Sequence, residues 1–256
     1  MCTLSWLNND DGYEIFFNRD EQRSRAKAIP PKLLNLQDVS VLMPVDPRGN
    51  GSWISVNEFG LSLCLLNFYQ GHNPRQNLKS RGQLLKTLSH FEDTKSVVLH
   101  LTSMDLTCYA PFTLVAITDK QEFSVKNTAA SHQTFQWDGQ HLQLVNLKRA
   151  MITSSSVMFD TVAPFRIDNF DALSSSASAE DHSRFHQGHT TKEGYKSVCM
   201  HREDAKTVSF SRIHVSDKEI KFSYLDGSPC QGGDYITTYL PRCVEGSVDQ
   251  SLPSPS

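Results

Sequence analysis

Residues 1–21 have the sequence MCTLSWLNNDDGYEIFFNRDE, and this stretch decides the expected fold. Two runs of strand-forming residues, Cys2–Leu7 and Tyr13–Phe17, flank a segment rich in Asn, Asp and Gly. That composition is typical of a turn between two paired strands, so the sequence predicts a β-hairpin. The open ends of this hairpin bring Cys2 close to Asn18–Glu21, which follow the second strand.

The composition is that of a soluble globular protein. The chain has 256 residues, of which 38% are hydrophobic and 21% charged, and its net charge is −3. This charge gives no basic footprint for nucleic acid, and no apolar run reaches the ~20 residues of a membrane span. The N-terminal apolar stretch is too short for a signal peptide, which favours a cytoplasmic location in a bacterial host. We expect one domain over residues 1–246 and a disordered tail over 247–256.

The six cysteines form no C-x-x-C pair, and the ten histidines show no zinc spacing, so no metal site is predicted. Cys199 and His201 lie two apart on a predicted strand and therefore share a face. They could be soft ligands for a metal or for haem iron. The favoured interpretation is a packed cysteine beside a half-exposed histidine.

The rest of the chain alternates between hairpins and a few helices. Residues 22–47 contain four prolines and are expected to form a loop. Further strands are predicted over residues 52–56, 61–66, 112–117, 122–126, 133–137, 141–145, 196–201, 207–215 and 219–225. Helices are predicted after the capping residues Ser80 and Asp93 or Thr94, and over residues 159–173. Strands in hairpins, with helices between strand blocks, indicate an α+β fold of antiparallel sheets covered by helices.

Several blocks of the chain together carry a resemblance. They are Met1–Leu4, Phe17–Glu21, Trp53–Asn57, Gly60–Asn67, Ser197–Arg202 and Gly227–Cys230. In this order, over nearly the whole chain, they resemble the NRDE family, the family of the transport and Golgi organisation protein 2. More distantly, the chain is similar to cysteine N-terminal-nucleophile hydrolases such as bile-salt hydrolases, penicillin V acylases and acyltransferases of penicillin synthesis. This resemblance implies a four-layer αββα sandwich.

Cys2 is the candidate nucleophile. If Met1 is removed, the thiol and a free α-amine belong to one residue, and the amine can accept the thiol proton near neutral pH. Arg19 could lower the thiol pKa and attract an anionic group, and Asp20 could orient the amine. Neighbouring residues on a strand point to opposite faces, so both can face Cys2 only where the strand bulges or ends. The alternative for Cys2 is a small apolar residue that opens a strand. The alternative for Arg19 and Asp20 is a surface ion pair, which contributes little to stability.

Other candidate residues follow from the resemblance. It implies that Asn67 donates to an oxyanion, although a polar residue that ends a strand is the simpler interpretation. The second oxyanion donor of the resembled hydrolases falls near Ser154, and their late arginine has only a possible counterpart in Arg212. The predicted ligand-binding residues are Asn18, Arg19, Asp20, Glu21, Ser154 and Arg212.

Two functions from different classes follow. In the first, which is slightly favoured, the protein binds and passes on an amphipathic ligand, haem or acyl-CoA, because the NRDE family has been linked to haem trafficking and to acyl-CoA or lipid handling. In the second, Cys2 attacks an amide as in an amidohydrolase or acyltransferase. No cofactor is required in either, haem being possible as cargo. Sheet edges could pair in a homo-oligomer.

Overall fold

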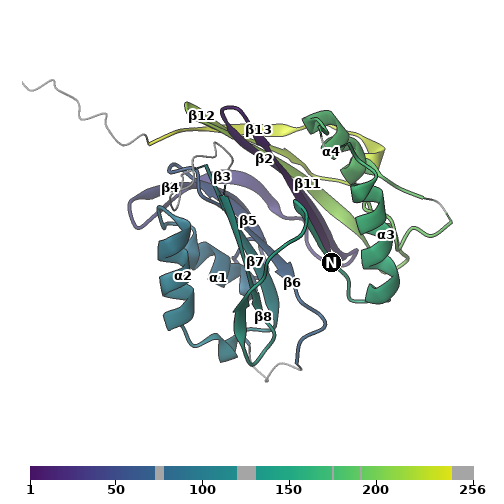
Figure 1. The fold of residues 1–256 in the computed structure, drawn as a ribbon, viewed down its shortest axis with the longest axis horizontal. Helices are drawn as coiled ribbons and strands as arrows, with labels where there is room; N and C mark the ends of the chain where they lie inside the picture. The colour runs from purple at the N-terminus through teal and green to yellow at the C-terminus, as the bar shows by residue number, and fades with distance from the viewer. Residues whose placement is uncertain (73–77, 120–130, 175, 191, 244–256) are drawn as a thin grey trace, which may run out of the picture.

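A computed structural model describes residues 1–72, 78–119, 131–174, 176–190 and 192–243. Two antiparallel sheets lie face to face, and a pair of helices covers the outer face of each (Figure 1). The predicted α+β fold, a four-layer αββα sandwich, is therefore confirmed. The predicted tail over residues 247–256 and the predicted strand over 122–126 lie outside the described residues.

The first sheet has six strands in the order β10-β1-β2-β11-β12-β13. They are β1 (Cys2–Asn9), β2 (Gly12–Gln22), β10 (Met151–Ser154), β11 (Ala205–Ser216), β12 (Glu219–Leu225) and β13 (Ile236–Pro241). The helices α3 (Phe159–Asp171) and α4 (Ala179–Gln187) pack on its outer face. The predicted N-terminal hairpin is confirmed, and its register pairs Cys2 with Arg19.

The second sheet has seven strands in sequence order, from β3 to β9. They are β3 (Ile29–Leu36), β4 (Val39–Val45), β5 (Ile54–Asn57), β6 (Ser62–Asn67), β7 (Phe112–Thr118), β8 (Ser131–Trp137) and β9 (Leu142–Leu144). The helices α1 (Arg81–Leu88) and α2 (Thr94–Ser103) cover its outer face. Asp93 caps α2 as expected, since its side chain accepts from the Ser96 amide.

The main core lies between the two sheets, and β6 shows how the layers form. Cys64 and Leu66 point into the space between the sheets, whereas Leu63 and Leu65 point toward α1 and α2. Both faces of this strand are therefore buried, which explains its nearly continuous apolar sequence. The end of β6 at Asn67 places an amide side chain at one edge of the inter-sheet core.

The expectation of a loop over residues 22–47 is wrong, because β3 and β4 occupy most of it. Two of its prolines, Pro30 and Pro31, lie on β3, an edge strand, where the register shifts between Ile29 and Lys32. A proline cannot donate to a sheet ladder, but an edge strand with a bulge needs no donor at that point. The prolines therefore mark an edge rather than the absence of a strand.

Further elements differ from the expectation, and one of them is β10 (Met151–Ser154), which was not predicted as a strand. Residues 196–201 are irregular instead of forming a strand. The helix α4 was not predicted, although Ser178 and Asp181 form a capping box at its start, a pattern visible in the sequence. The strand β13 was also not predicted; it pairs along β12 and forms an edge of the first sheet.

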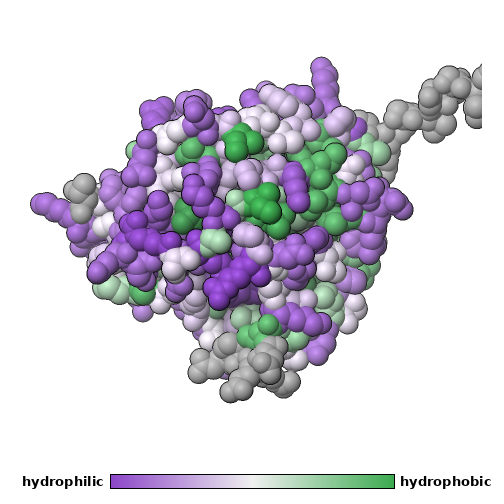
Figure 2. Space-filling view, turned by 180° about the vertical axis from the view of Figure 1, so that it is seen from behind, coloured by the Kyte–Doolittle hydropathy of each residue, from purple (hydrophilic) through white to green (hydrophobic). Residues whose placement is uncertain are grey.

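Hydrophilic side chains cover most of the face in Figure 2, with smaller apolar patches between them. Among the described residues, no helix is long and apolar enough to cross a membrane. The edge strand β13 exposes Ile236 and Tyr239. Unpaired edges of this kind can join two chains, so a homo-oligomer stays a prediction.

Candidate functional site

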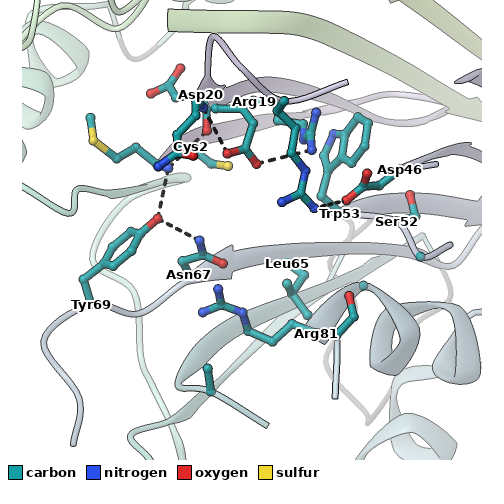
Figure 3. Close-up of a pocket in the computed structure, with 18 of the residues that line it drawn as sticks. Cys2, Arg19, Asp20, Asp46, Ser52, Trp53, Leu65, Asn67, Tyr69 and Arg81 are labelled. Carbon is teal, nitrogen blue, oxygen red and sulfur yellow. Dashed lines mark hydrogen bonds and ion pairs between the residues drawn. The ribbon is translucent and has the colours of Figure 1, made fainter. Parts of the chain in front are cut away.

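A cavity of about 510 Å³ opens where the ends of β1, β2 and β6 meet the start of α1. Cys2 and Arg19 line one side of it, and Asn67 and Arg81 lie on the opposite side (Figure 3). The hairpin register brings Cys2 and Arg19 together, because residues paired directly across two strands share a face. Five of the residues expected at the site line this one cavity: Cys2, Arg19, Asp20, Glu21 and Asn67.

The Cys2 thiol is buried at the end of this cavity. Burial raises its pKa above the ordinary value for a thiol, and the nearby N-terminal ammonium group and Arg19 offset only part of that rise. The backbone N–H of Cys2 donates to Ser154 Oγ at 3.0 Å. Only the thiolate is a strong nucleophile, so burial works against activation of Cys2, whereas the ammonium group and Arg19 work for it.

The Arg19 side chain is held flat against an aromatic ring. Its guanidinium carbon lies 4.1 Å from the centre of the Trp53 ring, and Nη2 lies 3.4 Å from a carboxylate oxygen of Glu21. A stacked guanidinium keeps its planar donor edge in a fixed direction. Glu21, which was also expected at the site, lines the same cavity.

The Asp20 carboxylate points away from Cys2, toward the layer of α3. Its Oδ1 accepts from Thr207 Oγ1 at 2.6 Å, and its Oδ2 lies 3.6 Å from Arg166 Nη2, with both charged side chains fully buried. The backbone carbonyl of Asp20, not its carboxylate, accepts from the Met1 ammonium at 3.2 Å. Of the two neighbours, Arg19 is thus the one whose side chain faces Cys2, as the alternation of strand side chains requires.

Tyr69 joins the N-terminus to Asn67 and was not expected from the sequence. Asn67 Nδ2 donates to the Tyr69 hydroxyl at 2.7 Å, and the Met1 ammonium donates to the same oxygen at 3.3 Å. Asn67 therefore points at the cavity rim beside the chain terminus (Figure 3). The oxyanion role of Asn67 stays a prediction, because its amide donates to Tyr69 in this structure.

Arg81 is the main residue of the cavity that sequence reasoning missed. It donates to the Pro111 carbonyl at 2.8 Å, and burial lowers the pKa of its guanidinium. Within the described parts of the chain, no carboxylate lies at ion-pair distance from it. It is the first residue of α1, and the helix N-terminus adds further positive potential on the same side. No sequence motif signals its direction, which depends on how α1 packs on the second sheet.

The carboxylates that line the cavity each have a cationic partner. The pairs are Asp20 with Arg166, Glu21 with Arg19, and Asp46 with Arg25. None of these carboxylates is paired with Arg81, so its positive charge has no carboxylate partner among the described residues that line the cavity. A cavity with this balance attracts an anionic group of a ligand.

The other predicted site residues are not among the described residues that line the cavity. The Asn18 amide donates to the carbonyls of His186 and Val198, on the helix side of the sheet. Arg212 Nε donates to a Glu14 carboxylate oxygen at 2.7 Å, at the other end of β2. Ser154 reaches the site only through its bond with the Cys2 amide.

A second group of donor side chains lies outside this cavity. Cys199, His201 and Cys230 place their sulfur and nitrogen atoms within 4.8 Å of one another. The sequence analysis had paired the first two on a strand, whereas the structure brings them together on an irregular segment.

Solved structures with low sequence identity share this fold. Penicillin V acylase from Agrobacterium tumefaciens superposes with a TM-score of 0.54 at 9% identity, over 94% of this chain and 86% of that chain. The C2A mutant of conjugated bile acid hydrolase from Clostridium perfringens superposes with a TM-score of 0.51 at 12% identity, over 94% of this chain and 92% of that chain. At such identities the likeness shows the fold alone, which is that of N-terminal-nucleophile hydrolases.

No curated protein sequence matches this chain. Residues 1–165 match the sequence profile of the family described as Transport and Golgi organisation 2. This range holds the N-terminal hairpin, the strand that ends at Asn67 and the start of α1, and so nearly the whole lining of the cavity. The chain therefore belongs to the Transport and Golgi organisation 2 family.

Proposed function

We propose that the Cys2 cavity binds the anionic head group of an amphipathic small molecule, and that the protein carries this molecule inside the cell. The observation that carries the proposal is the partly buried Arg81 guanidinium, which has no carboxylate partner among the described residues and lies on a wall whose carboxylates are each paired with another arginine. A partly desolvated guanidinium that meets only a neutral carbonyl keeps its full positive charge, and a bound anion would neutralise that charge.

Acyl-CoA is the favoured ligand, and haem is the second. The apolar lining is limited to a few side chains, among them Trp53 and Leu65, whereas charged and amide groups dominate the wall. A polar cavity suits the phosphates of coenzyme A better than a largely apolar macrocycle. Phosphate oxygens also match the planar donor edges that Arg19 and Arg81 present.

Palmitoyl-CoA, coenzyme A and haemin are the probes that test this proposal, each titrated into the full chain by calorimetry. We expect palmitoyl-CoA to bind, and Arg81→Gln to weaken it at least tenfold, or about 1.4 kcal/mol. Arg149→Gln is the matched control, because Arg149 pairs with Asp171 on the surface outside the cavity. The proposal fails if none of the probes binds, or if both variants bind equally well.

The second candidate function is hydrolysis or acyl transfer by Cys2. It is supported by the position of Cys2, Arg19 and Asn67 on one cavity of a fold that also carries an acylase and a hydrolase. It requires that Met1 be removed, so that the α-amine belongs to Cys2 and can accept the thiol proton. Ser154 Oγ, which now accepts from the Cys2 amide, would then hold that amine.

Chemical blocking of the α-amine separates the two functions. Hydrolysis of an amide substrate should stop when the amine is blocked and when Cys2 is replaced in Cys2→Ala, whereas acyl-CoA binding should change little. An intact mass that retains Met1 in active protein would exclude the hydrolase. Full turnover by Cys2→Ala would do the same.

A further inference from the structure

The cluster of Cys199, His201 and Cys230 has the geometry of a metal site. Cys199 Sγ lies 3.7 Å from His201 Nε2, and Cys230 Sγ lies 3.2 Å from the same nitrogen. Tetrahedral zinc, with bonds of about 2.3 Å to sulfur and about 2.0 Å to nitrogen, separates such ligands by about 3.5 Å. The observed separations therefore fit one ion between the three atoms with only small side-chain adjustments.

Both cysteines are free thiols, and they come from separate parts of the chain. Cys199 follows α4 by twelve residues, whereas Cys230 lies in the short 3-10 helix η2 (Pro229–Gln231), which packs against α4. Packing thus brings two thiols and one imidazole together, and these are ligand types that zinc prefers. Tertiary packing brings these three side chains together, because no pairing between the described strands joins their segments.

Backbone bonds hold each ligand in place. The Cys199 amide donates to the Gly188 carbonyl at 2.9 Å, and the His201 amide donates to the Gly194 carbonyl at 3.1 Å. Ser228, two residues before Cys230, donates from its hydroxyl to the Thr207 carbonyl at 2.6 Å. The three donors are therefore positioned before any ion arrives, which lowers the entropic cost of binding.

An open cavity of about 580 Å³ adjoins the cluster and is lined by Gln187, His189, His201, Cys230 and Gln231. The rings of His189 and His201 lie 4.5 Å apart. His189 Nδ1 lies 3.1 Å from the Cys199 carbonyl oxygen and so must donate its hydrogen to it. Its Nε2 then keeps a lone pair, and a histidine oriented in this way is a candidate fourth ligand.

We propose that Cys199, His201 and Cys230 bind a zinc ion, whose fourth position is taken by His189 or by a small ligand from the cavity. This site is separate from the Cys2 cavity and does not depend on the proposed carrier function. The two sites meet at Met200, which lies between two of the zinc ligands and packs against Met1.

Cobalt(II) is the probe that tests the zinc site, because its thiolate complexes absorb light whereas those of zinc do not. Full-length protein, stripped of metal by a chelator and kept with reductant, should bind one equivalent of cobalt, with thiolate charge-transfer bands that zinc abolishes. Cys230→Ser and His201→Ala should each weaken zinc binding by at least about 100-fold. Cys243→Ser is the matched control, because Cys243 is an exposed thiol on no part of the cluster.

Two ligand variants guard against a folding artefact, since Cys230 and His201 are both only partly buried. Thermal unfolding of the stripped variants should stay close to that of the stripped parent chain. The proposal is overturned if the reduced chain binds no cobalt, or if Cys230→Ser and Cys243→Ser bind it equally. A disulfide between Cys199 and Cys230 that persists in the presence of reductant would also overturn it.

Discussion

Cys2 lies on a regular strand, whereas Cys199 and His201 lie on an irregular segment and Cys230 lies in the short 3-10 helix η2. At Cys2, strand pairing places an arginine opposite the thiol, and burial keeps that thiol protonated. At the second site, loop packing places two sulfurs around one imidazole nitrogen. The comparison shows that the same residue type serves different chemistry according to the charges and donors around it.

The two regions are linked through a short chain of buried hydrogen bonds. The Met200 amide donates to Thr207 Oγ1 at 2.8 Å, and that hydroxyl donates to Asp20 Oδ1 at 2.6 Å. Met200 lies between Cys199 and His201, and Asp20 follows Arg19 of the cavity. Two variants and one labelling experiment, from the largest expected effect to the smallest, test whether the regions are as different, and as connected, as this geometry indicates.

Arg166→Met should damage both regions. Arg166 is fully buried; it lies beside Asp20, and its Nε donates to the Lys196 carbonyl at 3.1 Å, three residues before Cys199. Loss of one partner leaves the Asp20 carboxylate buried without its cation, which typically costs about 3–5 kcal/mol of unfolding free energy. Urea unfolding measures this loss.

The control for this variant is Arg149→Met, which breaks the surface pair with Asp171. That pair is solvent-exposed, so its loss should cost at most about 1 kcal/mol. If Arg149→Met destabilises the protein as much as Arg166→Met does, the buried pair is not what supports the two regions.

Thr207→Val should weaken the link and leave the general shape of the side chain intact. The change removes one acceptor and one donor, so the Met200 amide and Asp20 Oδ1 lose a buried partner, at a cost of about 1–3 kcal/mol. Zinc affinity should fall as well, because Met200 holds the two flanking ligands. Urea unfolding and zinc competition measure the two effects. Thr237→Val, at an exposed position on β13, should change neither.

Alkylation with iodoacetamide should distinguish the thiols of the two regions. Burial raises the pKa of the Cys2 thiol, so Cys2 should react several-fold more slowly than exposed Cys243 at neutral pH. Its rate should climb as the pH rises toward the raised pKa, because the thiolate fraction grows. Zinc should protect Cys230 and leave Cys2 unprotected; peptide mass spectrometry measures all three rates.

A fast Cys2 at neutral pH would contradict this prediction. It would mean that the thiol is activated, and it would favour the hydrolase over the carrier. If zinc protected Cys2 and Cys230 equally, it would not bind selectively at the cluster of Cys199, His201 and Cys230.

Some features of the site follow directly from local sequence. The hairpin between Cys2 and Phe17 is predictable because turn residues separate two runs of strand formers, and its register brings Arg19 to Cys2. The capping box of Ser178 and Asp181 carries the same kind of local information, although the helix α4 was not predicted from it. Local patterns of this kind succeed because neighbouring residues fix the backbone hydrogen bonds between themselves.

Other features depend on packing between distant segments. Nothing near Arg81 in the sequence indicates that it faces Cys2, since its direction follows from how α1 packs against β5 and β6. The choice between Arg19 and Asp20 also needed the structure. Buried Arg166, which comes from α3, holds the Asp20 carboxylate on the helix side of the sheet.

By itself, the sequence determined the antiparallel hairpins, the α+β class and the position of Cys2 near the Arg19-Asp20 pair, because these depend on the periodicity and turns of contiguous segments. Only the tertiary structure decided which charges remain unpaired at the cavity and which thiols meet His201. Both depend on contacts between residues far apart in the chain, and no local pattern encodes such distances. The uncompensated Arg81 and the cluster around His201 are therefore properties of the folded protein.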